Sequence, residues 1–242
     1  MKIPSRILAL TFALASTLSA APKEGGWEET YGMLLAKYVT PTGVKYAEWK
    51  KNGADVKALG EVTEAIGKAS VDSMSKNDQL AFYINAYNAW ILHGAVEKYP
   101  TNSVKDLFFR FFTADNIKVA GQQTSFKKLE DNVIRGKFHN PGVHFALNCA
   151  SRSCPPLNRE PFKGDSLDGK LDELAHAFIN SEKGVRFNES SKTAEVSAIF
   201  DWYKGDFPGG ALAFINKHRE KPLPDGTRLT YQKYDWSLNE AK

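Results

Sequence analysis

The sequence predicts an α+β fold, a single compact domain that is rich in helices and has a small sheet around a buried central helix. Apolar residues recur at helical spacing through most of the chain, and residues 75–99 are apolar nearly all round, which is typical of a buried helix. Short segments with strand character lie between the helices. No repeat, linker or low-complexity tract divides residues 21–242, so we expect one domain over that range.

The central helix has recognisable ends. Ser75, followed three residues later by Asp78, is a variant of the capping box with which helices begin. Pro100 ends the helix, because the residue before a proline is disfavoured in the helical conformation. The helix is therefore predicted from about Ser75 to Tyr99.

The other elements follow from the same periodicities. Further helices are predicted over residues 27–38, 56–66, 104–112, 126–135 and 167–178, with a last one around 212–215. Extended structure is predicted at 44–49, a hairpin at 117–125, a strand pair at 185–187 and 194–196, an aromatic segment on the core at 199–207, and a final strand at 229–231.

Residues 143–148 form a largely apolar run after a Pro-Gly pair and predict a buried strand. A loop from Cys149 to Cys154 follows it, and two prolines close the loop. Reactive groups are often carried by loops that follow regular elements, so this loop is the first place to look for chemistry.

The first residues are predicted to be a secretory signal over 1–20. Lys2 and Arg6 precede a short apolar run, and small residues at 19–21 favour cleavage after Ala20. We therefore expect a periplasmic or secreted protein. The apolar run is too short to cross a bilayer, and no later segment is long enough, so no integral membrane segment is expected.

Composition is that of an ordinary globular protein, with 42% hydrophobic and 25% charged residues. The formal net charge of +4 falls to +2 without Lys2 and Arg6. This weak charge and the absence of basic runs favour a solvated mixed surface, and no nucleic-acid partner is expected.

The chain has two cysteines, Cys149 and Cys154. An oxidising compartment would permit a disulfide between them. No histidines lie near them at ligand spacing, so no metal site is predicted, and nothing indicates a cofactor.

Several segments together resemble the domain of unknown function 547 family. They are Phe82–Ala89 with His93, Ser125–Glu130, Val143–Cys149 with Ser151, Cys154 and Pro155, Phe200–Tyr203 with Asp206 and Phe207, and Tyr234–Asn239. The resemblance spans about residues 30–240, with Tyr83 in place of the usual tryptophan, and the predicted signal makes the chain similar to an exported bacterial member. Some animal members carry a glutaredoxin-like domain, so the resemblance implies thiol or glutathione chemistry by analogy.

Cys149 is the candidate nucleophile, because a thiolate in a polar loop could be activated by Arg152 or by backbone N–H groups. The alternatives for Cys149 are a disulfide to Cys154 or simple packing in the core. His93 is the first candidate base, since packing could place it beside Cys149. His144 is the second, but residues five apart on a strand face opposite sides, which favours a hydrogen-bonded core histidine or one that lines a pocket on its own face.

Four polar residues are candidate substrate contacts: Asn85, Asn88, Glu130 and Arg152. Asn85 and His93 lie on one stripe of the central helix, whereas Asn88 lies on the other side of Asn85. For both asparagines the alternative is that their amides satisfy buried backbone groups.

The sequence is compatible with three functions. The first is a thiol enzyme of acyl-transfer type, a peptidase, amidase or transglutaminase-like catalyst with Cys149 as nucleophile. The second is a binding protein for a small thiol or peptide, such as glutathione, without catalysis. The third is a structural role in which Cys149 and Cys154 form a plain disulfide.

Overall fold

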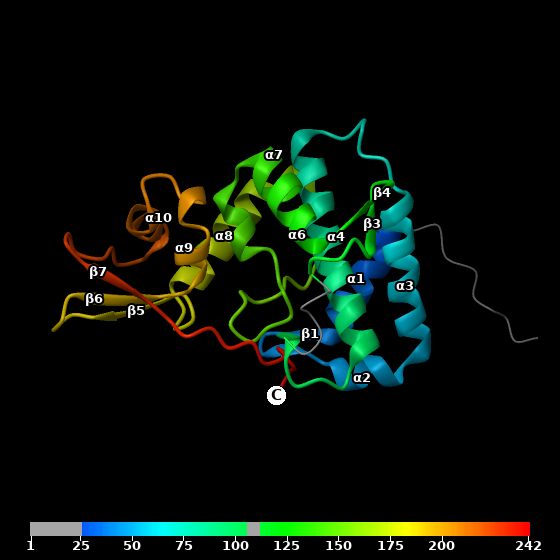
Figure 1. The fold of residues 1–242 in the computed structure, drawn as a ribbon, viewed down its shortest axis with the longest axis horizontal. Helices are drawn as coiled ribbons and strands as arrows, with labels where there is room; N and C mark the ends of the chain where they lie inside the picture. Colours follow the sequence, from blue (N-terminus) through cyan, green and yellow to red (C-terminus); the bar gives the residue numbers. More distant parts are fainter. Residues whose placement is uncertain (1–25, 106–111) are drawn as a thin grey trace, which may run out of the picture.

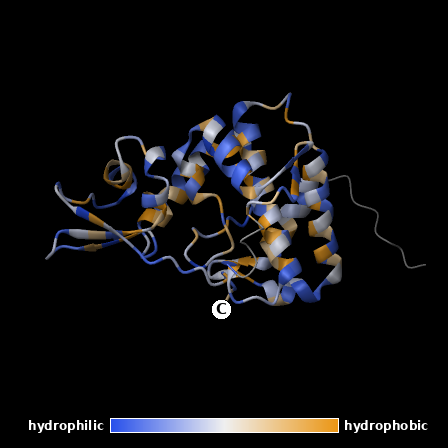
Figure 2. Ribbon diagram, in the orientation of Figure 1, coloured by the Kyte–Doolittle hydropathy of each residue, from blue (hydrophilic) through white to orange (hydrophobic). Residues whose placement is uncertain are grey.

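The computed structural model describes residues 26–105 and 112–242, and its α+β architecture is the one expected (Figure 1). The predicted signal at 1–20 lies outside the described residues, as does most of the helix predicted at 104–112. Hydrophobic and hydrophilic residues are interspersed along most of the helices, as expected where one face of a helix packs on the interior (Figure 2). Within the described residues, no helix combines the length and apolar character needed to cross a membrane.

Four helices form the larger body of the molecule. They are α1 (Trp27–Tyr38), α2 (Tyr46–Lys51), α3 (Gly53–Lys68) and α4 (Lys76–Lys98). The Ser75 side chain accepts a hydrogen bond from the backbone N–H of Asp78, which confirms the predicted start of the central helix. Most side chains of α4 are buried, including Ile84, Ala86 and Ala89, because α2, α3 and other elements surround it.

The prediction of extended structure at 44–49 is wrong. A short hairpin of β1 (Val39–Thr40) and β2 (Gly43–Val44) ends there, and α2 begins two residues later. Tyr46 and Trp49 are both buried, and their spacing of three places them on one face of a helical turn. A segment as short as 44–49 does not show whether its apolar residues recur with the period of a strand or of a helix.

The hairpin predicted at 117–125 is confirmed as β3 (Ile117–Val119) and β4 (Gln122–Thr124). The helix predicted after it is also present, but in three parts: α6 (Phe126–Lys128), a π-helical segment (Leu129–Arg135) and α7 (Gly136–Phe138). The wider π turns were not expected, and such turns are frequent at functional sites.

The strand predicted at 143–148 is also wrong. Residues Pro141–Phe145 form a 3-10 helix whose N-terminus is capped by Asn140, and the chain then turns irregularly towards Cys149. Residues 142–148 are buried all round, so they have no alternating face that a strand would show. A short apolar run does not distinguish these conformations.

The smaller end of the molecule contains a three-stranded sheet. Strands β5 (Val185–Asn188) and β6 (Thr193–Val196) pair, as predicted, and they run antiparallel, while β7 (Arg228–Tyr231) adds to β6 in parallel. Three helices accompany the sheet: α8 (Leu167–Ile179), α9 (Ile199–Trp202) and α10 (Ala211–His218). Helix α8 contacts both α4 and α10, so it joins this end to the helical body (Figure 1).

The C-terminal tail, residues 232–242, returns from β7 to the helical body (Figure 1). It forms isolated bridges from Ser237 to Ser103, from Leu238 to Ser151, and from Glu240 to Val44. The tail therefore runs along the Cys149–Cys154 loop and holds it against the rest of the molecule.

Candidate functional site

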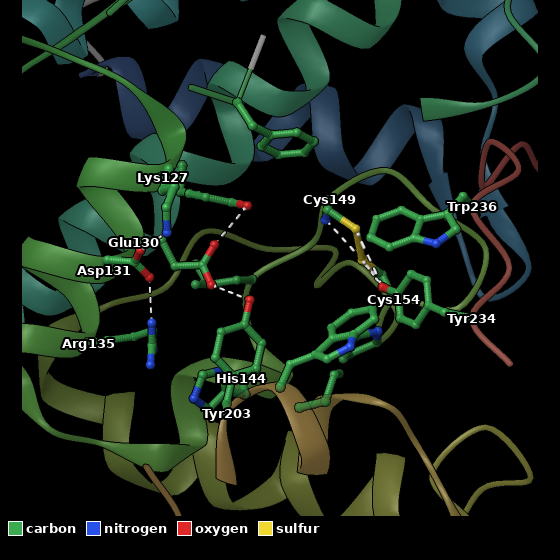
Figure 3. A pocket seen from close by; sticks show the side chains of 16 residues that line it. Lys127, Glu130, Asp131, Arg135, His144, Cys149, Cys154, Tyr203, Tyr234 and Trp236 are labelled. Atoms are coloured by element: carbon green, nitrogen blue, oxygen red, sulfur yellow. Dashed lines mark hydrogen bonds and ion pairs between the residues drawn. A yellow bond between two sulfur atoms is a disulfide. The ribbon is translucent and has the colours of Figure 1, made fainter. Parts of the chain in front are cut away.

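A cavity of about 440 Å³ opens between the π-helical segment, the loop around Cys149, α9 and the C-terminal tail. Its walls are largely aromatic, and its polar groups lie in two places. Figure 3 shows Glu130 and Arg135 on one side and the Cys149–Cys154 disulfide with Tyr234 and Trp236 on the other. The aromatic lining consists of Tyr87, Phe112, Trp202, Tyr203, Tyr234 and Trp236.

The first polar group, which we call the carboxyl end, consists of Tyr87, Glu130 and Tyr203. The hydroxyl of Tyr203 donates to Glu130 Oε1 at 2.7 Å, and that of Tyr87 donates to Oε2 at 3.3 Å. Glu130 is partly exposed because it faces the cavity, yet the surrounding protein raises the pKa of its carboxyl in spite of these bonds. Burial also raises the pKa of both tyrosines, so they remain donors.

Arg135 lies behind the carboxyl end and has its charge neutralised there. Its Nε and Nη2 donate to the two oxygens of Asp206 at 2.6 and 3.2 Å, and Nη1 donates to Asp131. The guanidinium also lies over the ring of Tyr203, 4.7 Å from its centre. Lys127 pairs with the same Asp131, so both cations of the lining already have carboxylate partners.

His144 packs against Tyr203. Its ring stacks on that of Tyr203 at 4.2 Å, and its Nε2 is 2.8 Å from Asp206 Oδ2. Burial lowers the pKa of His144 to about 4, so the ring is neutral near pH 7 and donates Nε2–H to the carboxylate. Burial would raise the pKa of Asp206, but the hydrogen bonds from Arg135 and His144 outweigh it and lower that pKa.

The second polar group, which we call the sulfur end, consists of Cys149, Ser151, Cys154 and Tyr234. Cys149 and Cys154 are joined by a disulfide, which leaves no free cysteine in the described chain. The hydroxyls of Ser151 and Tyr234 lie within hydrogen-bond distance of both sulfurs. Ala150, between Cys149 and Ser151, has a left-handed backbone with φ of 61°, which bends the loop tightly.

The two asparagines of α4 satisfy backbone groups. Asn88 donates to the carbonyl of Ala146 and accepts from the N–H of Asn148, both at 2.9 Å. Asn85 makes the same pair of bonds to the N–H and carbonyl of Phe162, also at 2.9 Å. Neither amide lines the cavity, although Asn88 positions the chain just before Cys149.

Two candidates from the sequence lie elsewhere. His93 packs beside Gly60 of α3 and Trp90, and it does not line the cavity. Arg152 points to the tail, where its Nη2 donates to the carbonyls of Leu238 and Glu240. Of the seven candidate residues, Glu130, His144 and Cys149 are brought to one cavity, and the other four are not.

Several residues of the site carried no assigned role at the sequence level. Tyr203, Asp206, Tyr234 and Trp236 lie within the segments that resemble the family, which is the one signal that could have indicated them. Tyr87 lies in another of these segments, Phe82–Ala89 on α4, so the same signal applies to it. Among the described residues, no group of three His, Cys, Asp or Glu side chains could hold a metal ion.

The fold and this site together define a helix-rich α+β protein with an aromatic-walled cavity that contains a disulfide. Residues 71–179 match the family model described as "Protein of unknown function, DUF547", and this match supports a member of that family. The matched residues include α4, the π-helical segment and both cysteines. No curated protein and no solved structure matches the chain.

Proposed function

We propose that the cavity binds a small thiol or a short peptide, a ligand of the glutathione type. The observation that carries the proposal is that one cavity of about 440 Å³ has a partly buried carboxyl at one end and a disulfide at the other. Cavities of this size take small organic ligands, and flat aromatic walls with few polar groups are typical of them.

The charges of the lining fit a zwitterionic ligand. Lys127 and Arg135 balance Glu130 and Asp131, and both cations are paired with Asp131. Of the described residues, none places a cation within ion-pair distance of Glu130, whose carboxylate has further acceptor positions beyond its two tyrosine bonds. Glu130 is therefore suited to accept a hydrogen bond from the amino group of a ligand.

Acyl transfer stays a prediction that the geometry favours less. It requires Cys149 as a free thiolate beside a base. In the structure Cys149 is bonded to Cys154, and the side chains that contact its sulfur are the hydroxyls of Ser151 and Tyr234. His93, the first candidate base, does not line the cavity.

The proposal is tested by titrating the oxidised protein with glutathione, S-methylglutathione and short peptides. Calorimetry gives the affinity, and fluorescence reports binding because Trp202 and Trp236 line the cavity. We expect Glu130→Gln to weaken binding about tenfold or more, because a hydrogen bond to a charged group is worth about 1.5–3 kcal/mol. Glu160→Gln, at an exposed carboxyl outside the cavity, is the matched control and should bind normally. Absence of binding by all of these ligands, or equal binding by Glu130→Gln, would contradict the proposal.

A further inference from the structure

The two sulfurs of the disulfide differ in their hydrogen bonds. Cys154 Sγ accepts from the backbone N–H of Cys149 at 3.0 Å and lies 3.2 Å from the hydroxyl of Tyr234 and 3.4 Å from that of Ser151. Cys149 Sγ is near the same two hydroxyls, at 3.5 and 3.0 Å, but has no backbone donor in the described residues. Each hydroxyl has one proton and can donate it to only one of the two sulfurs. The backbone N–H of Cys149, whose direction is fixed, donates to Cys154 Sγ.

The two sulfurs also differ in access. Both cysteines line the cavity, but Cys154 is only 5% exposed, whereas Cys149 is partly exposed. A reagent that enters the cavity therefore reaches Cys149 first. Cys149 is thus more accessible and has fewer hydrogen-bond donors. Cys154 is buried, and its donors would stabilise a thiolate.

We propose that this disulfide is redox-active, with Cys149 as the sulfur that a small thiolate attacks and Cys154 as the leaving group. The inference rests on the proposed function, because the attacking thiol is the ligand of the cavity. Exchange is faster when the leaving thiol is easily ionised, and donors aimed at a sulfur favour its thiolate.

The chemistry balances with small thiols as the co-reactant. A thiolate RS⁻ forms a bond to Cys149 Sγ, the disulfide bond breaks, and its electron pair stays on Cys154 Sγ. A second thiolate then attacks the R sulfur and releases the thiolate of Cys149 with RSSR. Two thiols are oxidised, the protein disulfide is reduced to two thiols, and the reverse steps reduce a small disulfide.

The backbone of the tail fixes the position of Tyr234, whose hydroxyl is the donor to Cys154. The backbone N–H of Asp235 donates to Ser153 Oγ at 2.8 Å, which ties the tail to the loop. Burial raises the pKa of Tyr234 to about 12, although Ser151 acts in the opposite direction, so the hydroxyl keeps its proton when Cys154 becomes a thiolate.

The first experiment traps the mixed disulfide. Oxidised protein is mixed with limiting glutathione, quenched in acid, alkylated and mapped by mass spectrometry. We expect about tenfold more glutathione on Cys149 than on Cys154, with Cys154 alkylated in the same molecules. Equal labelling, labelling mainly on Cys154, or a disulfide that reacts only after unfolding would overturn the inference.

The second experiment measures the thiols one at a time through the pH dependence of alkylation. In Cys149→Ser, we expect the Cys154 thiol to ionise about one pKa unit or more below the ordinary value of ~8.5. Adding Tyr234→Phe should reverse much of this shift, whereas Tyr231→Phe, at an exposed tyrosine of β7, should not. The Cys149 thiol in Cys154→Ser should stay near the ordinary value. A lower pKa for the Cys149 thiol than for the Cys154 thiol would also overturn the inference.

The two proposals can fail separately. If S-methylglutathione binds but glutathione does not open the disulfide, the cavity binds ligand and the redox inference is wrong. If dithiothreitol opens the disulfide through Cys149 while no peptide or thiol ligand binds measurably, the redox asymmetry stands and the binding proposal is wrong.

Discussion

The two ends of the cavity are built in different ways. The carboxyl end depends mainly on helices, because Tyr87 is on α4, Glu130 is on the π-helical segment, and Tyr203 follows α9 directly. The sulfur end depends on an irregular loop and on Tyr234 of the C-terminal tail, more than 80 residues away in sequence. Helical hydrogen bonds therefore fix the backbone around the residues of the first end, whereas long-range loop and tail contacts fix the backbone of the second.

This difference has consequences for the chemistry of each end. The carboxyl end places the carboxyl of Glu130 where burial raises its pKa, which favours the neutral form. The sulfur end offers a covalent bond that can open, and opening it releases the loop from one of its constraints. Substitutions that affect one end should therefore leave the other largely unchanged, unless they strike the residues that connect them.

The largest effect is expected from Asn88→Leu, which removes the connection between α4 and the sulfur end. The carbonyl of Ala146 and the N–H of Asn148 would lose their partners. Each such buried group costs about 1–3 kcal/mol, so for the two groups we expect the free energy of unfolding to fall by about 2–6 kcal/mol in denaturant titrations. The disulfide should also become easier to reduce, because its loop is no longer anchored.

Asn85→Leu is the matched control for this variant. It removes the same two kinds of bond from Phe162, which does not line the cavity. A similar loss of stability with unchanged reduction of the disulfide is the expected result. If both variants make the disulfide easier to reduce to the same extent, local anchoring by Asn88 is not what protects the disulfide.

The pH dependence of stability tests the support of the carboxyl end. Between pH 6.5 and about 4, His144 binds a proton in the unfolded chain but not in the folded one, because burial lowers its folded pKa. Stability should therefore rise with pH across this window, by at most about 3 kcal/mol, and be lost as the pH falls through it. His144→Gln should give a flatter profile in urea titrations at each pH. Equally steep profiles for the two proteins would show that His144 is not the group responsible.

A smaller effect of opposite sign is expected from Glu130. Its pKa is raised in the folded protein by burial, so above the ordinary value of 4.5 the unfolded chain releases its proton first. Stability contributed by the neutral carboxyl is therefore lost as the pH rises from that value. Glu130→Gln, which cannot ionise at this position, should gain stability relative to the wild type as the pH rises. A constant difference between the two proteins at every pH would contradict the raised pKa.

The parts predicted best from sequence are those whose signals are local. Ser75 and Pro100 marked the ends of α4 because capping and proline effects act within a few residues. The hairpin at 117–124 and the pair β5–β6 were found for the same reason. Residues 44–49 and 143–148 were assigned wrongly, because a short apolar run has no period long enough to separate strand from helix.

The sequence by itself determined the helical elements, the family and the proximity of Cys149 to Cys154, since each depends on neighbouring residues. Only the tertiary structure decided that Glu130 shares a cavity with the disulfide, that Asn85 and Asn88 satisfy backbone groups, and that His93 faces α3. The physical reason is that helical hydrogen bonds join residues four apart, whereas a cavity exists where side chains from distant segments leave space unfilled.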